Sequence, residues 1–243
     1  SLSVKLSGYF ITYDKIFDRP AQRYLTELLI GVNKKLMLRV GASFSNMHTS
    51  SFKTESFALY SKYRFFSQEE IHRHFRMALF FNASYSYAPF HGEEVELMGD
   101  KTGIAMGLIA TQLLNKFALS GSISHTQLLD SSRFNEVAYV PTRIYQAMNY
   151  SLSLGYLLFP REYVNFKQVN VNVYMEFLAQ QTLTQNKYYI DFAPAFQFII
   201  NSSWKLNAGY RVELGSNMSR LTASKWLLGF EKNFLNVWKR KSS

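Results

Sequence analysis

The sequence of 243 residues has no cysteine and no long apolar run. Its uninterrupted apolar runs are short, as in Leu28-Leu29-Ile30 and Phe198-Ile199-Ile200, whereas a membrane-spanning helix needs roughly 20 apolar residues. An open sheet edge cannot lie in hydrocarbon, so a closed barrel is the one membrane structure that this sequence allows. The lack of cysteine is compatible with an oxidising envelope and leaves no Cys/His cluster for a metal.

What the sequence does contain is a strict alternation of apolar and polar residues. Residues 188–200 divide into two sets, one apolar (Ile190, Phe192, Pro194, Phe196, Phe198, Ile200) and one mostly small or polar (Tyr189, Asp191, Ala193, Ala195, Gln197, Ile199). The alternation resumes over residues 204–214, after the turn Asn201-Ser202-Ser203. Period two places successive side chains on opposite faces, so this stretch predicts a β-hairpin.

The predicted strands are longer than those of soluble proteins, which usually have about five or six residues. A tilted membrane-spanning strand needs about 9–11 residues. The polar face carries charges but is also rich in glycine and alanine, as Ala193, Ala195 and Gly209 illustrate. This composition favours a narrow, wet lumen behind an apolar face in lipid over a soluble sandwich.

The same alternation occurs along the whole chain. It predicts about twelve strands, at residues 2–13, 24–32, 36–46, 55–66, 75–87, 102–114, 117–128, 145–159, 169–180, 188–200, 204–214 and 222–234. An even number is typical of single-chain bacterial barrels. We therefore predict an all-β fold, in which residues 1–243 form a single transmembrane, antiparallel, up-and-down β-barrel.

The connections between these strands alternate in length. Mostly short ones begin at Asn33, Ser67, Asn115, Pro160 and Asn201, and mostly longer ones at Asp14, His48, Pro89, Asp130, Thr182 and Ser216. Bacterial barrels have short periplasmic turns and longer external loops. We therefore expect an outer-membrane location with both termini in the periplasm, contact with outer-membrane lipids and lipopolysaccharide, and an external position for the acidic loop 89–100.

The inward positions carry many charges. The predicted lumen residues are Lys5, Glu27, Arg39, Lys62, Arg64, Arg76, Glu176, Asp191, Lys205, Arg211, Glu213, Lys225 and Glu231. One interpretation is a constriction that filters small solutes, with a mild preference for anions. The other is a lumen closed by mutual salt bridges, in a barrel that serves as a structural or accessory subunit of a larger envelope complex with other envelope proteins.

The net charge of +10 does not indicate a nucleic-acid partner, because the basic residues form no helical stripe and no nucleic-acid-binding motif is present. We predict no metal and no cofactor.

His48-Thr49-Ser50 raises a weaker alternative, a membrane-embedded lipid hydrolase, because a His-x-Ser pair places a base and a nucleophile on one face of a strand. It is similar to the arrangement in outer-membrane phospholipases and lipid A deacylases, and Glu55 lies near enough in sequence to orient His48. Polar loop residues explain the tripeptide equally well, so we expect no enzyme.

Several stretches also resemble a known family. They include residues 27–45 (ELLIGVNKKLMLRVGASFS), 102–125 (TGIAMGLIATQLLNKFALSGSISH) and 191–214 (DFAPAFQFIINSSWKLNAGYRVEL). In order and spacing they resemble the outer-membrane transporters named after the meta-pathway of phenol degradation. The resemblance implies a passive channel of Gram-negative bacteria for small, often hydrophobic compounds, and it brings no catalytic residues. One feature differs from outer-membrane barrels in general, where an aromatic residue usually ends the chain. Here Phe234 and Trp238 are followed by Lys239–Ser243.

Overall fold

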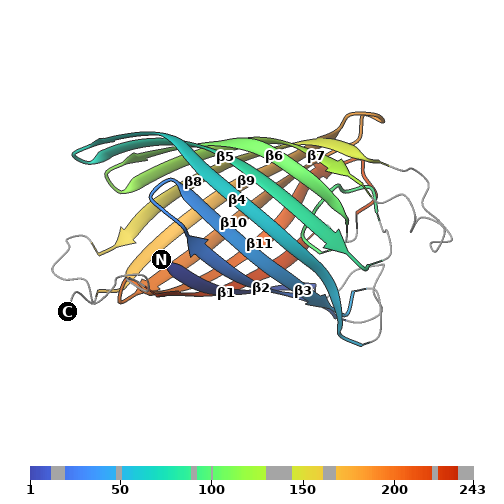
Figure 1. Cartoon of the computed structure of the whole chain (residues 1–243), viewed down its shortest axis with the longest axis horizontal. Coiled ribbons are helices and arrows are strands. Elements are labelled where there is room, and N and C mark those ends of the chain that lie inside the picture. The colour runs from blue at the N-terminus through green and yellow to red at the C-terminus, as the bar shows by residue number, and fades with distance from the viewer. Residues whose placement is uncertain are drawn as a thin grey trace.

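The computed structural model is a closed barrel of antiparallel strands (Figure 1). It describes residues 1–11, 20–47, 51–88, 92–99, 101–129, 144–160, 168–220 and 224–234. The strands are β1 (Leu2–Ile11), β2 (Ala21–Gly31), β3 (Leu36–Ser45), β4 (Lys53–Glu70), β5 (Arg73–Ser86), β6 (Gly103–Leu114), β7 (Phe117–Leu128), β8 (Gln146–Phe159), β9 (Asn170–Thr182), β10 (Tyr188–Ile200), β11 (Trp204–Ser216) and β12 (Ser224–Phe234). The twelve strands confirm the predicted fold class.

Each strand pairs with its neighbours in sequence, and β1 pairs with β12 to close the sheet. The closing register runs from Leu2 opposite Phe234 to Phe10 opposite Trp226. Closure leaves no continuous free edge, which is the requirement for a sheet in lipid. The part of the chain described here contains no helix that is both long and apolar enough to cross a membrane.

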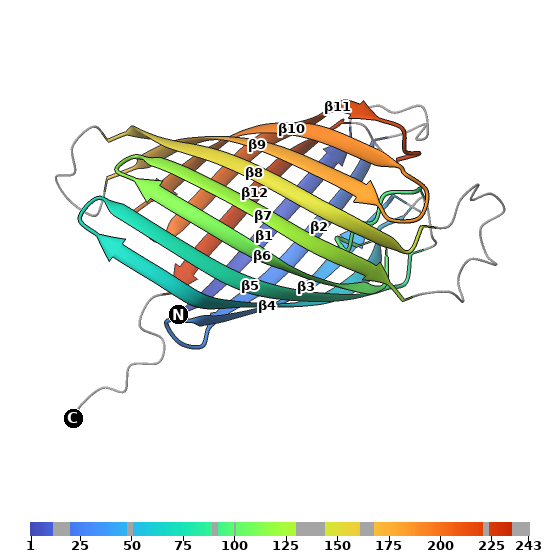
Figure 2. The ribbon, with the colours of Figure 1, turned by 90° about the horizontal axis from the view of Figure 1, so that it is seen from above.

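The barrel has two different ends, which lie at opposite sides of Figure 2. At the turn end lie Leu2, Phe234 and the tight turns at 71–72, 115–116 and 201–203. At the loop end lie longer connections, including the one between β5 and β6. Asn115, Asn201 and Ser202 have φ angles of 51°, 52° and 53°, a left-handed conformation that occurs in tight hairpin turns and that asparagine tolerates.

Side chains alternate between the outside and the inside of the barrel as predicted. Outward apolar residues keep much of their surface, for example 51% for Phe196, 50% for Leu228 and 45% for Leu152. Inward neighbours such as Asp191 and Gln180 are buried, at 0% and 2% exposure. The apolar exterior and the polar interior are the reverse of a soluble protein, and they match a barrel in lipid.

Two predicted boundaries differ most from the structure. The charged segment 67–74 is not a connection, because β4 and β5 continue to a turn of only Ile71 and His72. The register shift between Arg64 and Phe66 accommodates one extra residue, and such a bulge lets a strand bend and continue. At the start of β2, residues 21–23 belong to the strand and not to the preceding loop.

Candidate functional site: the lumen and its inserted loop

A belt of alternating charges crosses one wall of the lumen. The charge belt consists of Lys205, Glu231, Lys5, Glu27 and Arg39, on β11, β12, β1, β2 and β3. Lys205 Nζ lies 2.9 Å from a Glu231 carboxylate oxygen, and Glu27 binds both Lys5 Nζ and Arg39 Nη1 at 3.0 Å. Lys5 is also the register partner of Glu231. Register therefore places opposite charges beside each other on neighbouring strands, which stabilises them inside the barrel.

Other inward positions, on β7 to β11, carry uncharged polar side chains. Ser122 and Ser151 share a hydrogen bond of 2.7 Å across β7 and β8. Gln197 accepts from Asn172 Nδ2 at 3.1 Å and donates to Asn207 Oδ1 at 2.8 Å. These side chains satisfy one another's hydrogen bonds and give this part of the lumen a polar surface.

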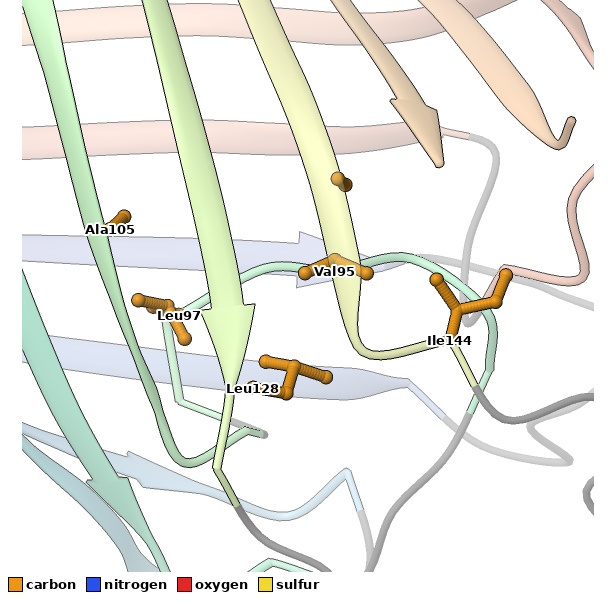
Figure 3. Close-up of a cluster of buried hydrophobic side chains, with 6 residues drawn as sticks. Val95, Leu97, Ala105, Leu128 and Ile144 are labelled. Carbon is orange, nitrogen blue, oxygen red and sulfur yellow. The ribbon is translucent and has the colours of Figure 1, made fainter. Parts of the chain in front are cut away.

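The acidic loop between β5 and β6 starts from the loop end of the barrel, and its described residues 92–99 enter the lumen. Both backbone groups of Val95 bind the Gln180 side chain on β9: the N–H donates at 2.8 Å and the carbonyl accepts at 2.9 Å. Val95 and Leu97 are 2% and 6% exposed and pack with Ala105 of β6, Leu128 of β7 and Ile144 just before β8, as Figure 3 shows. Ala147 of β8 belongs to the same cluster. Satisfied backbone groups and buried apolar side chains explain why the loop turns inward.

Charge also attracts this loop, because the wall presents two like-charged register partners. Arg211 on β11 faces Lys225 on β12, and such a pair is destabilising by itself. Glu94 lies 3.3 Å from Arg211 Nη2, and Glu96 lies 3.8 Å from Arg211 Nη1 and 3.7 Å from Lys225 Nζ. Asp191 on β10 already binds Arg211, with 2.5 Å between Oδ2 and Nε, and the loop carboxylates add negative charge beside both cations.

On the neighbouring pair of strands, two carboxylates face each other in place of two cations. Asp191 on β10 faces Glu213 on β11, and Arg220 from the following connection lies between them. Arg220 also donates to Glu94 at 3.0 and 3.2 Å, and its guanidinium carbon lies 4.0 Å from the centre of the Tyr189 ring. One arginine therefore joins the barrel wall to the inserted loop.

The carboxyl of Glu96 illustrates the strength of this ion network. Burial by itself raises its pKa, because a charged group is less stable away from water. The surrounding cations outweigh burial and lower the pKa of Glu96 to about 2; they are Lys225, Arg211, Arg23 and Arg220. Glu96 is therefore a carboxylate at neutral pH, locked in place by charge.

A second buried ion pair fixes the end of the loop. Arg23 binds Glu55 in a bidentate manner, with Nε to Oε2 and Nη2 to Oε1 both at 2.7 Å. Gly99 passes directly over this pair with a φ of +127°, and a Cβ there would lie 2.6 Å from Glu55 Oε2. Only glycine combines that backbone angle with such a close approach.

Twelve of the thirteen predicted lumen residues fall into three groups. Lys5, Glu27, Arg39, Lys205 and Glu231 form the charge belt; Asp191, Arg211, Glu213 and Lys225 contact the loop or Arg220; Lys62, Arg64 and Arg76 lie together at the turn end. Glu176 lines a cavity of about 350 Å³ under the loop, with Glu96 and Arg211.

Sequence reasoning missed Arg220, Arg23, Glu94 and Glu96 as lumen residues, because it placed all four in connections. The signal that pointed to them was the inward pair Arg211 and Lys225, which requires acidic partners.

His48 and Ser50 lie outside the described residues, so the lipid-hydrolase alternative that depends on them stays a prediction. Among the described residues, no group of three histidine, aspartate or glutamate side chains is arranged to hold a metal.

No protein-family model and no curated protein matches this sequence. The resemblance to the phenol-degradation transporters therefore stays a prediction. Solved structures match the fold. The NanC porin superposes with a TM-score of 0.53 at 9% identity, over 96% of this chain and 100% of NanC. The β domain of the Bordetella autotransporter BrkA gives 0.51 at 10% identity, over 96% of this chain and 98% of that domain. The chain thus has the fold of outer-membrane β-barrel proteins such as porins.

Proposed function

We propose that this protein is a passive channel for small solutes in the bacterial outer membrane, with both termini in the periplasm. The observation that supports this most is the lumen itself: it is polar, and cavities of about 350 and 460 Å³ lie inside the barrel. The apolar exterior faces outer-membrane lipids and lipopolysaccharide. The short turns mark the periplasmic end, as in other bacterial barrels.

The lumen is asymmetric in charge along its axis. At the loop end, the cations Arg23, Arg211, Arg220 and Lys225 are matched by carboxylates. At the turn end, Lys62 and Arg64 are not matched within the described residues. This basic excess favours a mild preference for anions, because fixed positive charge raises the local concentration of anions.

A planar-bilayer recording tests the proposal. The purified barrel should give discrete openings, and a salt gradient should give a reversal potential displaced toward that of the anion. Discrete openings with a cation preference would contradict the charge argument and leave the channel intact.

A closed barrel that serves as a structural or accessory subunit is the second candidate. The ion network and the Gln180 hydrogen bonds hold residues 92–99 inside the lumen, and this observation favours it. Complete silence of the reconstituted barrel, together with full recovery of folded protein, would support this candidate against the channel.

A further inference from the structure

The turn end of the lumen contains a cavity of about 460 Å³ with an unusual lining. Strands β1 to β6 and the turn between β2 and β3 surround it. Its cations are Lys34, Lys35, Lys62, Arg64 and Arg76, and no aspartate or glutamate lines it. We call this cavity the turn-end vestibule.

Two of these cations lie within the barrel without a carboxylate partner. Lys62 is half-buried, and within the described ranges it makes no ion pair. Arg64 is half-buried too, and its Nη2 donates to the backbone carbonyl of Lys34 at 2.5 Å. Arg76 differs, because it binds Glu69 at 2.7 Å at the exposed rim. Half-buried like charges repel each other, and a bound anion relieves that repulsion.

The rest of the vestibule combines apolar side chains with a few uncharged polar ones, namely Ser1, Ser3, Asn33 and Thr111. Leu29, Met37, Ala78 and Ile109 line the cavity, and each occupies an inward position in its strand. On the loop side the apolar surface continues: inward Tyr60 and Phe80 stack with ring centres 5.6 Å apart. The Arg39 guanidinium lies 4.4 Å from the centre of the Tyr60 ring.

We propose that the turn-end vestibule binds a small amphiphilic anion, namely a carboxylate carried on an aliphatic or aromatic body. The carboxylate lies between Lys62 and Arg64, where it accepts charge-assisted hydrogen bonds. The apolar body lies against Leu29, Met37 and Ile109. A volume of about 460 Å³ is within the usual range for small-molecule sites. A role in permeation rests on the proposed channel function, whereas binding itself does not.

Isothermal titration of the full chain in a non-ionic detergent tests this site, with benzoate as the probe. Benzyl alcohol lacks the charge and acetate lacks the ring, so both should bind about tenfold or more weakly than benzoate. Lys62→Gln should weaken benzoate binding about tenfold, because one charge-assisted contact is lost. This variant should still fold, since it removes a repelling cation. Arg73→Gln is the matched control: it removes an exposed cation beside the turn at 71–72, outside the vestibule, and should leave benzoate binding unchanged.

A second variant tests the apolar part. Ile109→Ser should weaken benzoate binding several-fold and leave acetate binding unchanged. Equal affinities for benzoate and benzyl alcohol, or equal losses in Lys62→Gln and Arg73→Gln, would overturn the proposal. Benzoate binding by a barrel that shows no conductance would refute the channel and keep this site. Conductance without benzoate binding would refute this site and keep the channel.

Discussion

Asp191 and Glu213 face each other as register partners on β10 and β11, and both contact the guanidinium of Arg220. Arg220 Nη1 lies 2.7 Å from Asp191 Oδ1 and 3.0 Å from Glu213 Oε2. Two carboxylates on facing positions of a sheet repel each other unless a cation lies between them. The stability of this part of the wall therefore depends on a residue from outside the strands.

Replacing that residue gives the first prediction. Arg220→Gln should lower the free energy of unfolding by about 3–5 kcal/mol, the usual cost of removing one partner from a buried ion pair. Unfolding in denaturant would measure this loss of stability, with the folded fraction determined from the different gel mobilities of folded and unfolded barrel. Arg73→Gln, at an exposed site, should change the stability little. Equal stabilities of the two variants would contradict the bridging role of Arg220.

The second prediction concerns the inserted loop. The double variant Glu94→Gln, Glu96→Gln should loosen residues 92–99 and raise the single-channel conductance. Each lost charge-assisted contact weakens the docked loop by about 1–3 kcal/mol. The anion preference should increase as well, because Lys225 loses its contact with Glu96 and Arg211 keeps its contact with Asp191 but loses those with Glu94 and Glu96. Glu70→Gln removes an exposed carboxylate at the other end, outside the vestibule, and should leave the conductance unchanged. A similar change in both variants would rule out the loop as its cause.

Acidification supplies the third prediction. Cations hold the pKa of Glu96 at about 2, below its ordinary value of 4.5, so the ionised carboxylate stabilises the docked loop. A carboxylate whose pKa is lowered in the docked loop stabilises docking fully when the pH is above its ordinary pKa. This stabilisation is lost as the pH falls through the lowered pKa. Conductance should therefore stay constant from pH 7 to about 4.5 and rise between about 4.5 and 2. In Glu96→Gln the share of this change due to Glu96 should vanish, and an unaltered pH profile in that variant would refute the assignment.

The fourth prediction tests which side of the sheet faces lipid. Leu152 points outward near the middle of β8 and is 45% exposed, whereas Ser153 points inward and is the register partner of Glu176. Leu152→Arg should destabilise the barrel in bilayers by about 2–4 kcal/mol. Ser153→Arg should cost little, because the new cation lies beside the Glu176 carboxylate. Unfolding of both variants in lipid vesicles would show the difference, and a larger loss from Ser153→Arg would reverse the assignment of the two faces.

The barrel itself was predictable because its cause is local. A period of two in residues such as Phe196, Gln197 and Phe198 assigns each side chain to a face without any knowledge of distant segments. Turn residues such as Asn115 and Asn201 mark the hairpins, so the number and order of strands follow from the chain alone. Local pattern was less informative for β4 and β5, where a bulge and a charged extension concealed continuous strands.

The ion network of the lumen was decided by tertiary structure. Arg220 and Glu94 are 126 residues apart, and only the closed barrel and the path of the loop bring them together. The sequence determined that Arg211 and Lys225 point inward on adjacent strands, but their partners depend on where residues 92–99 lie. Repulsion between those two cations, the burial of Val95 and its bonds to Gln180 together draw the acidic loop into the lumen, and none of these long-range effects can be read from periodicity.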